Sequence, residues 1–282
     1  MKKFLLVGVL CITVLTSMIA VKGKEAAKAG SITNKITTVN KSVTNEVLIN
    51  YWVDSLYSQM QLAAIGLSRP VFFEAYKGYE YLLSVNKIKK QGFLTICDYS
   101  QASNKRRLYV LDIDKAKVLF NTYVSHGRNS GSAFATSFSN SNDSHKTSLG
   151  FMSTAETYNG DNGYSLRLDG LESGFNDNVR ARAIVMHGSN YVNGRRASDG
   201  TMMGRSYGCP AVPAKEVKGI INAIKGGSCF FSYYPDKMYA AASKILNADF
   251  IWPLTQTPQL ASLKLPDSLV KNLSQPDAFN LN

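Results

Sequence analysis

Hydrophobic positions divide the chain into a helical front and a strand-rich middle. Between residues 46 and 90, apolar and aromatic side chains recur at three- and four-residue spacings, which predicts two amphipathic helices. The first is marked by Val47, Leu48, Tyr51, Trp52, Leu56 and Met60. The second has Ser68 as its N-cap and Pro70 in its first turn, and its stripe is Phe73, Tyr76, Tyr79, Leu82 and Leu83. We expect both stripes to be core.

From Gly92 onward the pattern is typical of strands. Strands are predicted at 92–98, 107–113, 117–125, 163–169, 182–187 and 228–234, where runs are alternating, β-branched or aromatic. The second and third flank a polar turn and should form a hairpin. Helices are expected at 213–224, ended by two glycines, and at 238–246. The pattern predicts a mainly β (α+β) fold with helices at its front and flank.

The first residues have the character of an export signal. Lys2 and Lys3 precede an uncharged, mostly apolar run at 4–20, and the best cleavage point follows Gly23. A membrane anchor is the rival interpretation. The predicted organisation is a signal peptide at 1–23, a polar linker at 24–45, a helical segment at 46–90, a catalytic domain at 91–235 and a tail with one helix at 236–282.

Composition narrows the class of protein. A chain of 282 residues with 45% hydrophobic and 18% charged residues can bury one main core. Cleavage after Gly23 removes three lysines and no acid, so the formal charge falls from +12 to +9. A basic exported protein suits a carboxylate-bearing wall polymer, although solubility alone explains the charge equally well. The sequence has no nucleic-acid motif, so no nucleic-acid partner is expected.

Three cysteines remain after cleavage: Cys97, Cys209 and Cys229. An odd number leaves at least one thiol unpaired. Cys97 and Cys229 both lie in apolar strand candidates, so any disulfide is expected to join them and leave Cys209 free. Asp112 and Asp114 flank a hairpin turn without the histidines or cysteines of a metal site, and we expect no metal and no organic cofactor.

Cys209 and His187 stand out as a candidate nucleophile and base. A catalytic cysteine needs a nearby base, backbone amides for the oxyanion and exposure to substrate. Cys209 lies between a glycine and a proline, and His187 ends an apolar strand just before Gly188. Taken singly, each residue fits a structural role better.

Two motifs carry a resemblance to a known family. MHGSN from Met186 and GRSYGCP from Gly204 resemble the His-Gly plus Ser-x-Gly-Cys signature of the YkuD-type murein L,D-transpeptidases, in a divergent branch with an SxGCP motif. The likeness extends over roughly 60–235. It includes the segments 94–113, 125–131, 146–154 and 164–177.

The resemblance implies a β-sandwich catalytic domain and a cysteine acyltransferase acting on peptidoglycan stem peptides. The thiolate would attack the L-centre carbonyl of a diamino acid in a stem tetrapeptide and expel the terminal D-Ala, and a neighbouring stem amine would resolve the thioester. By the same resemblance Cys209 is the nucleophile, His187 the base, and the amides of Gly208 and Cys209 the oxyanion hole. Gly188 and Ser206 match supporting positions.

The sequence departs from the commonest family motif at several places. Tyr207 and Ala211 stand where that motif has His and Asn or Arg, so we expect substrate-carboxylate binding elsewhere, with Arg205 as the candidate. His126, in an HGRNSG stretch, is expected to fix a loop rather than to transfer protons. The long spacing between His187 and Cys209 predicts an enlarged loop over the site at 188–205, with a lid function.

Other functions remain open at this point. Water in place of the amine would make the protein an L,D-carboxypeptidase, and a disulfide at Cys209 would leave a non-catalytic envelope-binding module. A papain-like endopeptidase has its Cys before its His, the reverse of this chain. We expect an exported protein of the periplasm or cell envelope, with membrane contact only through an uncleaved signal.

Overall fold

The computed structural model describes residues 47–249. The predicted signal peptide, the linker and the end of the tail lie outside the described residues. In the part that is described, no helix is both long enough and apolar enough to cross a membrane.

The elements follow one another in a mixed order. Residues 47–59 are helical. After them come η1 (Leu62–Ile65), α2 (Arg69–Ser84), β1 (Phe93–Asp98), β2 (Leu108–Asp112), β3 (Lys117–Thr122), β4 (Gly150–Gly160), β5 (Gly163–Gly170), β6 (Val185–Ser189), α3 (Gly194–Ser198), β7 (Ala211–Pro213), α4 (Val217–Ile224), β8 (Cys229–Tyr233) and α5 (Lys237–Ala242).

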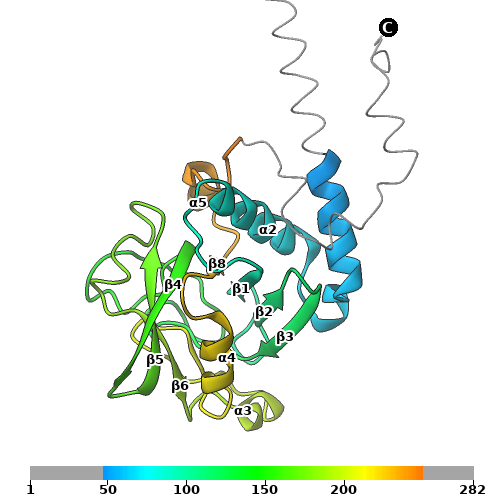
Figure 1. Cartoon of the computed structure of the whole chain (residues 1–282). Helices are drawn as coiled ribbons and strands as arrows, with labels where there is room; N and C mark the ends of the chain where they lie inside the picture. Colours follow the sequence, from blue (N-terminus) through cyan, green and yellow to red (C-terminus); the bar gives the residue numbers. More distant parts are fainter. Residues whose placement is uncertain (1–46, 250–282) are drawn as a thin grey trace, which may run out of the picture. The chain divides into compact units, whose positions relative to one another are not determined.

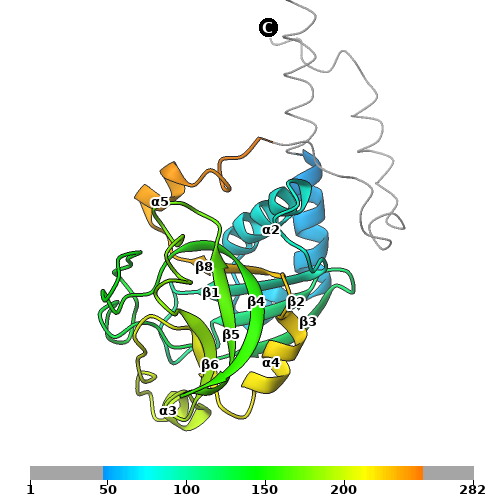
Figure 2. The ribbon, with the colours of Figure 1, turned by 60° about the vertical axis from the view of Figure 1, so that its left-hand side comes forward.

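The strands form one hydrogen-bonded sheet in the order β3-β2-β1-β8-β4-β5-β6-β7. The β1–β8 and β6–β7 pairs are parallel, and the other neighbours are antiparallel. The sheet curls until it is nearly a barrel (Figures 1 and 2). The mainly β prediction is confirmed, and the predicted hairpin is β2–β3.

The central strands β1, β2 and β8 are buried on both faces, which explains their nearly continuous apolar runs. Alternate side chains of β1 go to different cores: Leu94 and Ile96 to one, Cys97 to the other. The first core is covered by α2 and the helix at 47–59, and the second by α4. Figures 1 and 2 show α2 and α4 on different sides of the strands. The aromatic stripes of the two front helices are therefore core, as predicted.

The longest strand, β4, was missed from the sequence. Its outer half is polar and partly exposed, and its register with β5 shifts between Thr154 and Thr157. Such an irregular, half-polar strand lacks the alternation that identifies strands. Its pairing with β8 on one side and β5 on the other defines it.

The helix expected from Pro213 begins four residues later, at Val217. Residues 211–213 instead form β7, in which Val212 pairs with Gly188 and Pro213 with Ser189. The predicted start of the helix is therefore wrong, because the residues just after Cys209 pair with β6 as a strand. The expected helix N-terminus is thus separated from the cysteine by β7.

Any disulfide was expected to join Cys97 and Cys229, and the structure excludes that pairing. Both thiols are free and buried. Cys229 pairs with Leu94 on β1, and Cys97 lies three residues further along that strand and therefore on the opposite face. The sheet separates the two sulfur atoms, so the geometry of a disulfide cannot be met.

Glu172 fastens α5 to the sheet. Its carboxylate accepts hydrogen bonds from the Phe151 amide at 2.7 Å, from the Tyr239 hydroxyl at 2.8 Å and from the Ser243 hydroxyl. Glu172→Ala is expected to lower the free energy of unfolding by about 3 kcal/mol, because three buried donors lose their acceptor. Glu172→Gln keeps one oxygen and is expected to cost about 1 kcal/mol. Urea denaturation measures both, and equal losses would contradict this account.

Glu80 makes stability depend on pH. It is 5% exposed in α2, and burial together with the negative charge of Asp114 raises its pKa to about 7, against a smaller opposing effect of its hydrogen bond with Tyr76. The folded state therefore keeps a proton that the unfolded chain loses above its ordinary pKa of 4.5. The stabilisation is complete below that pH and is lost as pH rises to about 7.

The free energy of unfolding is accordingly expected to fall between pH 5 and pH 8, by on the order of 2 kcal/mol from this residue. Glu80→Gln should remove that part of the slope, because the amide does not titrate. Denaturation series at several pH values on both proteins provide the measurement. If the free energy of unfolding fell equally with pH in both proteins, Glu80 would not be the cause of that fall.

Candidate active site

The strand pair β6–β7 brings the two predicted catalytic residues to one place. His187 on β6 pairs with Ala211 on β7, and Cys209 precedes Ala211 by two residues. The smallness of Gly188 permits this arrangement, because a Cβ there would lie 2.9 Å from Val217 Cγ1 and 3.1 Å from Ala214 Cα. The start of α4 therefore packs directly on the backbone beside His187.

A tight turn presents Cys209. Ser206 Oγ donates to the Cys209 carbonyl at 2.7 Å and accepts from the Gly208 amide at 3.1 Å. Gly208 has φ 117°, and a Cβ there would lie 2.7 Å from the Lys146 carbonyl oxygen. The Ser-x-Gly-Cys spacing thus has a physical reason, because the serine closes the turn and the glycine supplies its unusual backbone.

The Cys209 sulfur lies against the beginning of β6. The Val185 amide donates to Sγ at 3.5 Å, and the thiol lies 3.8 Å from the Ala183 carbonyl oxygen. Val185 is two residues from His187 on the same strand, a separation of about 6.5 Å along the backbone. The sulfur therefore contacts the strand that carries His187, two residues before the histidine.

His187 is a buried imidazole whose ring is held by its own neighbour. The side chain is 4% exposed, and its Nδ1 lies 3.1 Å from the Gly188 carbonyl oxygen, which requires the proton on Nδ1. Burial lowers the pKa of His187, and the hydrogen bond to Gly188 opposes this in part. The imidazole is thus neutral at neutral pH, with the lone pair of Nε2 available to accept a proton.

The thiol is also neutral at rest. Burial raises the pKa of Cys209, while the Val185 amide and the positive charge of Arg182 act in the opposite direction. A raised thiol pKa and a lowered imidazole pKa both favour the uncharged pair. Thiolate formation therefore has to accompany proton transfer to a base.

A cleft of about 330 Å³ opens next to the cysteine. It is lined by Asn142, Asp143, His145, Ala181, Arg182, Ala183, Ile184 and Tyr207. Ala183 belongs both to the cleft and to the surroundings of Cys209 Sγ. Three of the six non-glycine residues with positive φ in 47–249 line it: Asp143, His145 and Ala183. Backbone held in this region is common at functional sites.

Tyr207 stands on the rim of this cleft. It is 61% exposed, its ring centroid lies 4.4 Å from that of His145, and the Arg128 guanidinium lies 5.0 Å over its ring. Two residues before the nucleophile position, the chain thus presents an exposed aromatic surface where the commonest motif has a histidine.

Arg182 is a cleft residue that the sequence reasoning missed. Its Nη1 donates to the Ser139 carbonyl and Ser148 Oγ, and its Nη2 to Ser144 Oγ and the Lys146 carbonyl, at 2.6 to 3.1 Å. The arginine lies in a polar RAR stretch just before the apolar strand of His187. Nothing in that local pattern separates it from a surface arginine, because its acceptors come from distant loops.

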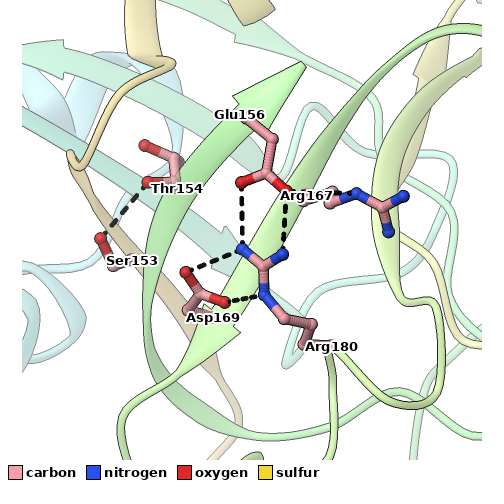
Figure 3. Close-up of polar contacts among 6 residues, drawn as sticks. All are labelled: Ser153, Thr154, Glu156, Arg167, Asp169 and Arg180. Atoms are coloured by element: carbon pink, nitrogen blue, oxygen red, sulfur yellow. Dashed lines mark hydrogen bonds and ion pairs between the residues drawn. The ribbon is translucent and has the colours of Figure 1, made fainter. Parts of the chain in front are cut away.

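Arg180, two residues before Arg182, makes exposed ion pairs of its own, whereas Arg182 is held by its four hydrogen bonds. Arg180 donates to both oxygens of Glu156, at 2.8 and 3.1 Å, and to both oxygens of Asp169 (Figure 3). Arg167 contacts Glu156 at 3.3 Å on its other side. These exposed pairs contribute little stability singly, but the bidentate geometry fixes the turn against β4 and β5.

Of the residues predicted for the site, only Tyr207 is among those lining this cleft; Cys209 and His187 are not, and His126 and Arg205 lie at another loop. His126 is fully buried; its Nδ1 accepts from Arg107 Nη2 at 2.8 Å, and its Nε2 lies 3.4 Å from the Gly131 carbonyl. Burial and the charge of Arg107 lower the pKa of His126 to about 4, so it is neutral. Arg205 Nη1 donates to the carbonyls of Arg128 and Gly131. Both residues hold the 126–131 loop, and neither is among the residues lining the cleft.

The 188–205 segment contains α3 and a small core of its own. Val192 and Met203 pack with Ala211, and the Met203 amide donates to Ser103 Oγ at 3.1 Å. The segment is therefore attached to β7 and to the loop at 103, and none of its residues lines the cleft. Its lid function stays a prediction.

The structure is thus a curled mixed sheet in which a turn carrying Cys209 lies against the strand that holds His187. The family model described as L,D-transpeptidase catalytic domain matches residues 63–233. The match covers more than half of the chain, and the chain belongs to this family. The YkuD-type resemblance is thereby confirmed. A search of curated proteins found no match.

Solved structures with a similar fold include several L,D-transpeptidases. An L,D-transpeptidase from Mycobacterium smegmatis is 12% identical with a TM-score of 0.32, over 51% of this chain and 59% of that one. The helical cell shape determining protein Pgp2 from Campylobacter jejuni is 14% identical with a TM-score of 0.34, over 58% and 57%. An L,D-transpeptidase from Xylanimonas cellulosilytica is 13% identical with a TM-score of 0.29, over 63% and 92%. The chain thus spans little more than half the length of the first two.

Proposed function

We propose that this protein is an exported peptidoglycan L,D-transpeptidase that acts through a Cys209 acyl-enzyme. The observation that carries the proposal is the position of Cys209 Sγ against β6, the strand that also holds His187, inside the matched catalytic domain. The partner is the peptidoglycan stem peptide, and the place of action is the periplasm or cell envelope.

In the proposed first half-reaction, His187 Nε2 takes the thiol proton as Sγ attacks the L-centre carbonyl of the diamino acid. The new C–S bond forms a tetrahedral oxyanion. Its collapse breaks the C–N bond to D-Ala, and His187 returns the proton to the leaving amine. A thioester on Cys209 remains.

The oxyanion donor proposed from this turn is the Cys209 amide. The family resemblance implied the amides of Gly208 and Cys209 together, but the Gly208 amide already donates to Ser206 Oγ. Use of both amides requires that hydrogen bond to break when substrate binds. Ser206 and Gly188 are positioning residues in this proposal, and Tyr207 is a substrate-contact residue on the rim.

In the second half-reaction an amine from a neighbouring stem attacks the thioester, forms the crosslinking amide and restores the thiol. Water in place of the amine gives the alternative, an L,D-carboxypeptidase with a tripeptide product. All three cysteines in the described part of the chain are free, which favours an enzyme over a binding module with a blocked Cys209.

The test uses residues 24–282 and a muropeptide with tetrapeptide stems. We expect D-Ala release with either a crosslinked dimer or a tripeptide, and mass spectrometry distinguishes the two. Intact-mass measurement after a carbapenem should show a covalent adduct on Cys209. Absence of D-Ala release from folded protein on several stem chemistries would overturn the proposal.

A further inference from the structure

Two arginines on one short segment differ in how their charge is compensated. Arg180 is held by two carboxylates, Glu156 and Asp169 (Figure 3). Arg182, two residues later, is half-buried and makes its hydrogen bonds to two carbonyls and two hydroxyls, all of them neutral. Among residues 47–249, no carboxylate lies within ion-pair distance of Arg182.

The positive charge of Arg182, which no carboxylate of the described chain neutralises at ion-pair distance, lies beside Cys209. Arg182 and Ala183 line the same cleft, and the Ala183 carbonyl is 3.8 Å from Sγ. Arg182 Nη2 would lie 3.4 Å from a Cβ at Gly208, the residue before the cysteine. The same Nη2 donates at 2.7 Å to the Lys146 carbonyl, which also borders Gly208. Four hydrogen bonds therefore hold a full positive charge next to the turn that carries the sulfur.

We propose that Arg182 is the positioning residue that sets the ionisation of Cys209, as a fixed cation that stabilises negative charge on the sulfur. A guanidinium stays protonated throughout the range in which a thiol titrates. In a half-buried site its field is screened less than on the surface. A helix N-terminus close to Cys209 would also favour the thiolate, but α4 begins only at Val217. The charge of Arg182 takes that role.

The other groups that act on Cys209 do not supply this charge. His187 is neutral, and Tyr99 and Tyr191, which also interact electrostatically with the cysteine, become anions when they ionise. Asp143 faces the same cleft and attracts Arg182 at longer range. Of the groups facing Cys209, Arg182 is thus the cation that favours the thiolate.

Alkylation of Cys209 by iodoacetamide across a pH series tests the proposal without any peptidoglycan substrate, because only the thiolate reacts. Cys97 and Cys229 are fully buried, and Cys209→Ala protein gives the background. Arg182→Gln is expected to move the midpoint of the profile to higher pH and to lower the rate near pH 8 about tenfold. Arg182→Lys should recover most of the rate, because it restores the charge with a different shape.

Arg180→Gln is the matched control, because it removes an arginine from the same segment whose charge is already neutralised. It should leave the profile unchanged. The proposal is overturned if Arg182→Gln leaves the profile in place, or if Arg180→Gln or Arg182→Lys shifts it as far as Arg182→Gln does. The inference rests on the proposed function only where it says that the ionisation of Cys209 serves catalysis. A shifted profile in a protein that releases no D-Ala would refute the function and keep the inference.

Discussion

Cys209→Ala protein is expected to release no measurable D-Ala from tetrapeptide muropeptides, a loss on the order of 10⁴-fold or more. The reason is that the acyl-enzyme cannot form without the sulfur. Cys209 is half-buried in a turn held by Ser206 and Gly208, so its replacement should leave the fold intact. Quantitative D-Ala assay and thermal unfolding on the same samples provide the measurement.

Cys97→Ala is the matched control for this experiment. It removes a thiol that lies in the second core on the face covered by α4, where it reaches no cleft. It should lower stability somewhat through the small cavity and retain D-Ala release. If the Cys209→Ala protein released D-Ala at the wild-type rate, the acyl-enzyme mechanism would be refuted.

His187→Ala is expected to lower kcat/KM at pH 7 by on the order of 10²-fold or more, because proton transfer from the thiol and to the leaving amine loses its base and acid. The deficit should narrow as pH rises. Burial raises the pKa of Cys209, so in the variant the spontaneous thiolate fraction keeps growing into the alkaline range. Steady-state D-Ala release from pH 6 to pH 10 measures both effects.

His145→Ala provides the comparison within the same cleft. The His145 ring is tilted against that of Tyr207 and lines the cleft, but His145 lies outside β6, the strand whose Val185 amide contacts Cys209 Sγ. We expect a change of only a few fold, without the pH-dependent recovery. A deficit for His187→Ala that stayed constant to pH 10 would argue for a structural role of this histidine.

Local sequence patterns were sufficient for most of the secondary structure. The aromatic stripes at three- and four-residue spacings gave the helix at 47–59 and α2, because a buried helix face must repeat with the helix period. The apolar runs gave β1, β2, β6 and β8 to within a few residues, since strands buried on both faces have no polar alternation, and the alternating leucines gave β5. The motif residues around His187 and Cys209 gave the family.

Long-range contacts decided what the sequence could not. The polar half of β4 is a strand because β5 pairs with it, and residues 211–213 are β7 rather than helix because β6 pairs with them. The expected Cys97–Cys229 pairing fails because Cys97 lies three residues along β1 from Leu94, the partner of Cys229, and therefore on the opposite face of the sheet. These outcomes depend on partners far along the chain, which local periodicity does not specify.

The same division holds for the site. The sequence by itself determined the nucleophile and base candidates, because a Ser-x-Gly-Cys turn and a His-Gly strand end are local chemistry. Only the tertiary structure decided which arginine faces the cysteine. Arg205, expected from the sequence to bind the substrate carboxylate, instead donates to the carbonyls of Arg128 and Gly131. Arg182 is 27 positions before the cysteine and lies beside it because four acceptors from the 139–148 loop hold its guanidinium there.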